Sequence, residues 1–185
     1  MAKPETTQHH TVVVIGAGAA GTSVAASLLR QRPGLDVAIV EPNDVHYYQP
    51  AFTLVGGGAY SLAKTARPQA ETLPASARWV RAAVDELEPD SNSVTLSDGR
   101  RLAYDILVVT PGLKLNWDGV EGLRDTLGRN DVCSNYDPSL AEYTWQCLKA
   151  FKGGKALFTQ PQAPIKCAGA PQKIAYLAAD YVRRK

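Results

Sequence analysis

Apolar runs alternate with a segment of helical periodicity in the N-terminal part of the chain. Residues 12–15 are all β-branched and apolar, and residues 35–40 form a second, mostly apolar run. Between them, residues 19–31 carry small and apolar side chains at helical spacing and stop before a Pro-Gly pair, which is typical of a helix end. The order strand, helix, strand predicts a βαβ unit with two parallel strands.

Farther along, the pattern changes to strands separated by turns. Residues 78–88 alternate apolar and polar positions with a period of two, which predicts one strand. Residues 94–96 are strand-like, a Ser-Asp-Gly turn follows, and residues 102–104 lead into an apolar strand at 105–112. We therefore expect a three-stranded antiparallel insert followed by a buried strand.

The last third of the chain predicts a helix and then the start of a second unit. Asp137 is a suitable N-cap, Pro138 suits the first helical position, and apolar residues recur at helical spacing up to a double glycine. Residues 155–159 predict a strand, and a helix is expected from about Pro171. Strand, loop and helix in this order are typical of a Rossmann-like unit.

The composition is that of a globular domain. Apolar residues make up 45% of the 185 residues, and 20 basic against 18 acidic residues give a net charge of +2. No basic run has interleaved aromatic residues, so the sequence shows no nucleic-acid footprint. The apolar stretches are strand-length, too short for a membrane span, and residues 1–10 are polar and resemble no signal peptide. We expect a cytoplasmic location and a disordered lead-in at residues 1–10.

A GxGxxG motif at residues 16–21 follows the first predicted strand. Gly16 permits a tight turn, Gly18 lets the backbone approach a pyrophosphate, and Gly21 lets the helix pack closely on the strand. The pyrophosphate is expected on the N–H groups of the helix N-terminus. Glu41, which ends the second strand, accepts hydrogen bonds from ribose hydroxyls and repels a 2′-phosphate, which disfavours NADP and leaves FAD or NAD.

The three cysteines differ in context. Cys147 lies on the apolar stripe of the predicted helix, so we interpret it as a packing residue. Cys133 lies in a polar loop, where an ordinary exposed thiol is expected, and the spacings do not indicate a metal site. Cys167 precedes a helix N-terminus and lies near Lys166 and Lys173 in the sequence, which favours the thiolate.

The antiparallel insert and the apolar strand that ends in Thr110-Pro111-Gly112 resemble the FAD domain of flavoproteins with two dinucleotide-binding domains. This resemblance favours FAD over NAD for the first site. The second loop, residues 160–171, lacks GxGxxG and contains prolines, which offer no N–H to a phosphate. A nicotinamide nucleotide is therefore not expected there.

Residues 46–58 and 166–173 closely resemble segments of sulfide:quinone oxidoreductases, in particular the branch that includes the mitochondrial enzyme. In that family a cysteine in a Lys-Cys-Ala-Gly-Ala-Pro context carries sulfane sulfur beside the flavin, and Cys167 has this position. The resemblance also implies FAD contacts at Ala19, Ala20, Glu41, Gln49 and Val84, with Gly112 near the flavin.

The implied reaction is the two-electron oxidation of sulfide. Sulfide attacks a cysteine-bound sulfur bridge and leaves a persulfide on one cysteine and a thiolate on the other. The flavin takes up the electrons and passes them to a membrane quinone.

The fold class expected is α/β: a Rossmann-like FAD-binding domain at residues 11–153 with its antiparallel insert, and the truncated start of a second such unit at 154–185. Because family members are much longer, we expect an N-terminal portion that does not oxidise sulfide alone. The second redox cysteine, the quinone pocket and any peripheral membrane association belong to a full-length form. A sulfide dehydrogenase flavin subunit, a type-II NADH:quinone oxidoreductase and a non-catalytic dinucleotide-binding remnant stay open as alternatives.

Overall fold

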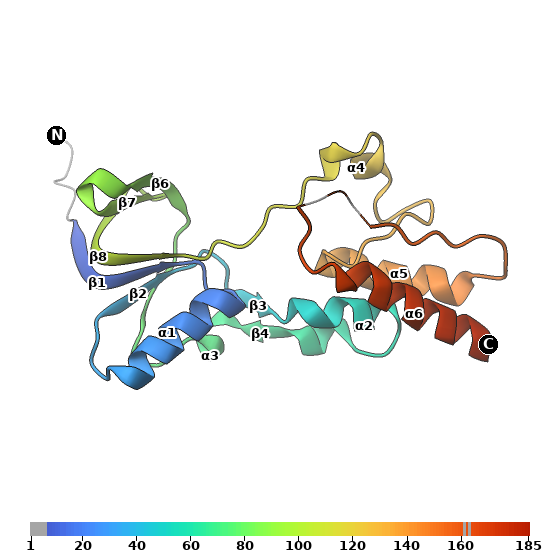
Figure 1. Cartoon of the computed structure of the whole chain (residues 1–185), viewed down its shortest axis with the longest axis horizontal. Helices are drawn as coiled ribbons and strands as arrows, with labels where there is room; N and C mark the ends of the chain where they lie inside the picture. The colour runs from blue at the N-terminus through green and yellow to red at the C-terminus, as the bar shows by residue number, and fades with distance from the viewer. Residues whose placement is uncertain (1–6, 161, 163) are drawn as a thin grey trace. The chain divides into compact units, whose positions relative to one another are not determined.

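The computed structural model describes residues 7–160, 162 and 164–185. The chain divides into two units, Met1–His46 with Arg67–Gly112 and Tyr47–Ala66 with Leu113–Lys185 (Figure 1). This division differs from the expected boundary at residue 153, because residues 113–153 belong with the C-terminal helix in the second unit.

The first unit is built on one six-stranded sheet with strand order β5-β2-β1-β8-β7-β6. Strands β5, β2, β1 and β8 are parallel, with Val13 of β1 opposite Ala38 of β2 and Leu107 of β8, and β7 and β6 continue the sheet antiparallel. The strands are β1 Gln8–Ile15, β2 Val37–Val40, β5 Arg78–Val80, β6 Val84–Glu88, β7 Ser93–Leu96 and β8 Arg101–Val109. The expected α/β fold with parallel strands and an antiparallel part is confirmed.

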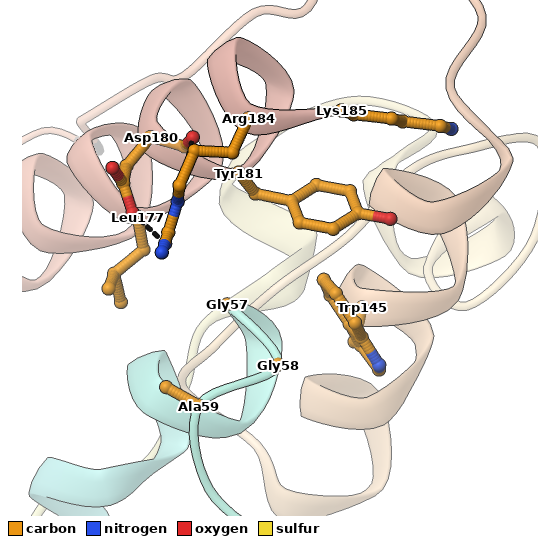
Figure 2. A pocket seen from close by; sticks show the side chains of 9 residues that line it. All are labelled: Gly57, Gly58, Ala59, Trp145, Leu177, Asp180, Tyr181, Arg184 and Lys185. Atoms are coloured by element: carbon orange, nitrogen blue, oxygen red, sulfur yellow. Dashed lines mark hydrogen bonds and ion pairs between the residues drawn. The ribbon is translucent and has the colours of Figure 1, made fainter.

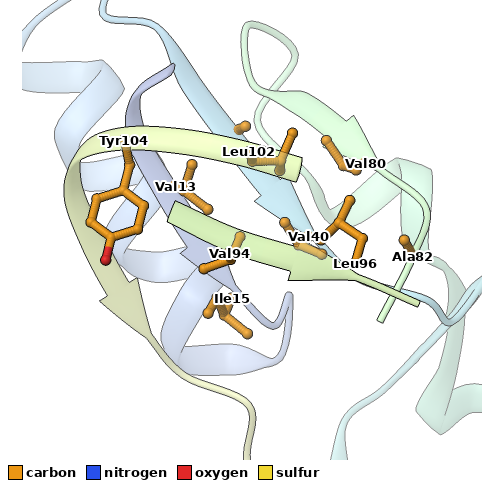
Figure 3. Packing of buried hydrophobic residues seen from close by; sticks show 10 residues of the cluster. Val13, Ile15, Val40, Val80, Ala82, Val94, Leu96, Leu102 and Tyr104 are labelled. Atoms are coloured by element: carbon orange, nitrogen blue, oxygen red, sulfur yellow. The ribbon is translucent and has the colours of Figure 1, made fainter. Parts of the chain in front are cut away.

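Helix α1, Ala19–Gln31, covers one face of this sheet, as the periodicity predicted. Its buried residues Ala25 and Leu29 pack in one cluster with Val12, Val14 and Ile39 of the sheet. On the opposite face of β1 and β2, Val13 and Val40 pack with side chains of β5, β7 and β8 (Figure 3). That cluster comprises Val13, Ile15, Ala38, Val40, Val80, Ala82, Val94, Leu96, Leu102 and Tyr104. Both faces of β1 and β2 are therefore buried, as is typical of parallel strands.

Two strand predictions in this unit need correction. Residues 78–88 form two strands, because the chain turns at Ala82, whose N–H bonds to the Val80 carbonyl, and so leaves β2 for the antiparallel ribbon. The strand predicted at 105–112 is the second half of β8 and is not buried: Ile106 is 56% and Val109 52% exposed. Along β8, strand β7 pairs with Arg101–Ala103 alone, so the second half of β8 has a neighbouring strand, β1, on one edge only.

The disordered lead-in predicted for residues 1–10 is wrong at its end. Residues 8–10 begin β1 and pair with residues 102–104 of β8. His10 is buried, and its Nδ1 lies 3.0 Å from an Asp36 carboxylate oxygen. Polar side chains thus continue the strand with partners outside it: His9 contacts Asp105 of β8, and His10 contacts Asp36, which directly precedes β2. Residues 1–6 lie outside the described residues.

The second unit is helical. Asp137 caps α5 as predicted, its carboxylate accepting the Ser139 N–H at 2.8 Å. Phe52 and Val55 of α2 pack on Ala141 of α5, and Leu148 of α5 packs on the C-terminal helix α6. The helices of this unit are α2 Phe52–Gly56, α4 Leu123–Thr126, α5 Pro138–Ala150 and α6 Gly169–Arg184, with 3-10 turns at Gln49–Ala51, Leu62–Thr65 and Trp117–Gly119.

The remaining elements are short. Strands β3 Val45–Tyr47 and β4 Ala66–Pro68 form a two-stranded sheet, and α3 Gln69–Thr72 and a 3-10 turn at Pro89–Ser91 belong to the first unit.

The strand predicted at residues 155–159 is not formed. The segment pairs with no strand among the described residues, and its side chains Leu157 and Phe158 are 84% and 41% exposed. An apolar sequence favours a strand, but the strand needs a hydrogen-bonding neighbour to exist. Of the strand, loop and helix predicted for this part of the chain, the described residues contain the helix, α6, but not the strand.

Candidate functional site

The glycine-rich turn between β1 and α1 is closed by backbone contacts. Gly16 has φ +89°, and a Cβ there would meet the Thr110 carbonyl, whose carbon would lie 2.9 Å away. A Cβ on Gly21 would meet the Gly16 carbonyl oxygen and lie 2.7 Å from Thr110 Oγ1. Both positions therefore require glycine for the structure itself.

Gly18 is different, because a Cβ there would have no atom within 4 Å. Gly18 is the N-cap of α1, no side chain caps this helix end, and its first turn holds no acidic residue. Gly18, Ala19 and Ala20 are exposed. The turn thus offers free N–H groups at the positive end of a helix dipole, an arrangement suited to a phosphate group.

Thr110 ties the end of β8 to this turn. Its hydroxyl donates to the Ile15 carbonyl at 2.7 Å and lies 3.2 Å from the Gly16 carbonyl oxygen, and its backbone N–H also bonds Ile15 at 2.9 Å. Gly112, two residues later, has φ +78°. The Thr-x-Gly segment that the sequence placed near the cofactor therefore lies against the glycine turn.

Glu41 lies beside the same turn, with a side chain that is largely buried. Its Oε2 accepts the Ala17 N–H at 2.9 Å, and its Oε1 accepts the Asn43 backbone N–H at 2.9 Å and side-chain amide at 2.6 Å. Three donors hold the carboxylate in place, and its remaining lone pairs suit ribose hydroxyls. The sequence reasoning overlooked Asn43, although an amide two residues after the strand-end acid is a local signal for this arrangement.

The other predicted cofactor residues lie at separate places. Val84 begins β6, where its half-buried side chain packs against the cluster of Figure 3. Gln49 begins the 3-10 turn Gln49–Ala51 and belongs to the second unit. The first unit thus contains Gly16, Gly18, Ala19, Ala20, Gly21, Glu41 and Gly112, and Gln49 belongs to the second unit.

Cys167 lies just before α6, exposed and with φ +59°. A non-glycine residue in this left-handed region is strained unless its surroundings hold it. The Cys167 carbonyl accepts the Ala170 N–H at 3.0 Å, which joins the cysteine to the first turn of α6. Lys166, next to it, has its pKa lowered by partial burial, an effect that the neighbouring Cys167 opposes. The Lys173 ammonium donates to the Pro50 carbonyl at 3.0 Å.

Cys133 and Cys147 are half-buried and line a cavity of about 830 Å³ in the second unit. The thiol of Cys133 donates to the Asp131 carbonyl at 3.5 Å. Burial, together with the neighbouring Cys147, raises the pKa of Cys133 to about 12. The interpretation of Cys133 as an ordinary exposed loop thiol is therefore wrong, because the loop folds back onto α5.

A second cavity of about 400 Å³ lies between α2, α5 and α6 (Figure 2). Its charged groups already have partners: Arg184 pairs with Asp180, and Lys185 donates to the Lys149 carbonyl of α5 at 2.8 Å. Trp145 and Tyr181 stack edge to face. These contacts make the cavity a helix-packing feature, and we assign no ligand to it.

The residues that the structure describes contain no group of three or more His, Cys, Asp or Glu side chains placed to hold a metal ion. Within the same ranges, no helix has the length and hydropathy that crossing a bilayer requires.

Comparison with known proteins agrees with these features. The mitochondrial sulfide:quinone oxidoreductases of Dictyostelium discoideum and Mus musculus are 44% and 40% identical to the chain over 94% and 95% of its length. The crystal structure of the sulfide:quinone oxidoreductase from Aquifex aeolicus matches this chain with 25% sequence identity and a TM-score of 0.63. The match covers 78% of this chain and 32% of the Aquifex chain.

The chain spans 39% of the length of the two mitochondrial relatives. The resemblance predicted from the two sequence motifs is confirmed by these relatives. The model of the family described as pyridine nucleotide-disulphide oxidoreductase matches residues 10–143, which include most of β1, the glycine turn, Glu41 and Thr110. The chain belongs to the pyridine nucleotide-disulphide oxidoreductase family.

Proposed function

We propose that the chain is the part of an FAD-dependent sulfide:quinone oxidoreductase that binds the pyrophosphate and a ribose of FAD and carries one sulfur-bearing cysteine, Cys167. The observation that carries this proposal is Cys167 itself. It is exposed, in a strained conformation, at the start of a helix, and it lies in a chain 44% identical to such an enzyme.

The residues present fit a flavin dinucleotide. The space beside Gly18 admits a pyrophosphate, and the uncapped N–H groups at the start of α1 bind it. The Glu41 carboxylate accepts hydrogen bonds from the ribose hydroxyls. The fixed negative charge of Glu41 disfavours a 2′-phosphate, which supports FAD over NADP. Gln49, Val84 and Gly112 are proposed as further contacts by family resemblance. When bound, FAD supplies the acceptor for the two electrons released as sulfide becomes sulfane sulfur.

Cys167 holds the sulfane sulfur as a persulfide. The thiolate is the attacking form of a cysteine, and exposure gives a small sulfur nucleophile or donor access to it. A positive φ accompanies the link of the Cys167 backbone to the first turn of α6, where its carbonyl accepts the Ala170 N–H. The second cysteine, the quinone site and peripheral membrane association belong to the longer enzyme under this proposal.

Sulfane-sulfur capture tests the proposal. The chain is mixed with inorganic tetrasulfide, and the mass gain of one sulfur is followed separately on the peptides of Cys133, Cys147 and Cys167. We expect the persulfide first on Cys167, and none on that peptide in Cys167→Ser. Earlier capture by Cys133 or Cys147, or no capture at all, would contradict the proposal.

A further inference from the structure

Tyr136 contacts the chain on both sides of Cys167. Its hydroxyl donates to the Lys166 carbonyl at 2.8 Å, and the Cys167 carbonyl oxygen lies 3.3 Å from the same hydroxyl. These two carbonyls belong to the peptide groups before and after the Cys167 α-carbon. One side chain therefore restrains both peptide groups that determine how the cysteine points.

This restraint acts on a conformation that needs support. Cys167 has φ +59°, a value that an ordinary side chain adopts only when its surroundings hold it there. The bond from the Ala170 N–H holds the cysteine from the α6 side, and Tyr136 holds it from the loop before α5. Tyr136 itself is fixed in the chain, because it directly precedes Asp137, the N-cap of α5.

We propose that Tyr136 is the positioning residue for Cys167: its hydroxyl holds the two flanking carbonyls so that the thiol keeps the orientation in which it takes up sulfur. The inference rests on the proposed function of Cys167, but Tyr136 lies outside both motifs that carry the family resemblance, residues 46–58 and 166–173. Tyr136 contacts no reacting atom, so its effect passes through the backbone of Cys167.

The first test compares Tyr136→Phe with the wild-type chain in the tetrasulfide reaction. The Cys167 thiolate attacks a sulfane sulfur, a new S–S bond forms on Cys167, the S–S bond of tetrasulfide breaks, and trisulfide leaves with the electron pair. Capture of sulfur at Cys167 is expected to slow about fivefold, because the loss of one neutral hydrogen bond lowers the population of the held orientation by about that factor. Tyr176→Phe is the matched control, because Tyr176 lies on α6 and is 72% exposed.

Alkylation by iodoacetamide, measured on the same peptides, separates positioning from unfolding. The half-buried Cys133 reports loss of structure, so its rate is expected to stay unchanged in Tyr136→Phe while that of Cys167 falls. A Cys167 rate equal to wild type would overturn the inference. If the wild type takes up no sulfane sulfur and Tyr136→Phe still slows alkylation of Cys167 alone, the positioning role stands and the proposed function fails.

A second variant keeps the test decisive if Tyr136→Phe does not fold. Trifluorotyrosine at position 136 keeps the ring and hydroxyl but ionises near neutral pH, and the ionised form donates no hydrogen bond. Burial raises the pKa of the natural Tyr136, so the wild-type donor persists over this range. The Cys167 rate relative to wild type at each pH is expected to fall as the analogue ionises. A ratio independent of pH would refute the positioning role.

Discussion

Alanine at Gly18 and alanine at Gly21 are expected to have different effects, although both residues belong to one motif. At Gly21 the new Cβ meets the Gly16 carbonyl oxygen and lies 2.7 Å from Thr110 Oγ1. Because backbone does not move aside as a side chain does, we expect a loss of about 3 kcal/mol of stability, the upper end for overpacking. At Gly18 no atom lies within 4 Å of the new Cβ, and φ of −67° suits alanine.

For Gly18→Ala, the lower entropy of the unfolded chain offsets the poorer helix cap, so stability is expected to stay within about 1 kcal/mol of wild type. The new methyl group, however, occupies the space proposed for the pyrophosphate. FAD affinity is therefore expected to fall at least about tenfold, equal to about 1.4 kcal/mol.

Urea unfolding followed by circular dichroism measures the first quantity, and quenching of flavin fluorescence on binding measures the second. Gly169→Ala is the control, since its Cβ also has no atom within 4 Å and it lies at the start of α6. If Gly18→Ala unfolds as easily as Gly21→Ala, the geometry of the turn is misread. If Gly18→Ala binds FAD as tightly as wild type, the pyrophosphate does not lie there.

Two further outcomes follow from the second unit. At neutral pH iodoacetamide should modify Cys167 fastest and Cys133 slowest, because a pKa of about 12 leaves the Cys133 thiol almost wholly protonated. The modification rate of Cys133 should rise as the pH increases towards that value. Rapid modification of Cys133 at neutral pH would contradict its burial. Phe52→Ala should cost about 3–5 kcal/mol because Phe52 is 2% exposed, whereas Leu157→Ala at 84% exposure should change stability by less than about 0.5 kcal/mol in the same urea titration. Equal effects of the two substitutions would place Phe52 outside the core.

Local signals in the sequence predicted the elements that the residues specify by themselves. Helix α1 runs from Ala19 to Gln31 as its spacing and the following Pro-Gly pair indicated, and Asp137 caps α5. The glycine turn was predictable because Gly16 and Gly21 have steric reasons within the chain, while Gly18 leaves open space beside the turn. Of the candidate site, Gly16, Gly18, Gly21 and Glu41 gather where the βαβ pattern placed them.

What the sequence did not predict depends on partners distant in the chain. Residues 155–159 have the composition of a strand but no strand beside them among the described residues, and residues 8–10 are polar yet pair with β8. Cys133 looked exposed because its loop is polar, but α5 buries it. The Tyr136 contact joins residues 30 positions apart, which no local pattern reveals.

An equilibrium titration with FAD and with NADH tests whether the turn between β1 and α1 is a flavin dinucleotide site. The chain is expected to bind FAD more tightly than NADH, and Glu41→Gln should weaken FAD binding about tenfold through loss of charge-assisted hydrogen bonds. Glu86→Gln, on the exposed side of β6, is the control and should leave the affinity unchanged. Tighter binding of NADH than of FAD, or equal affinities for FAD in wild type and Glu41→Gln, would contradict the account.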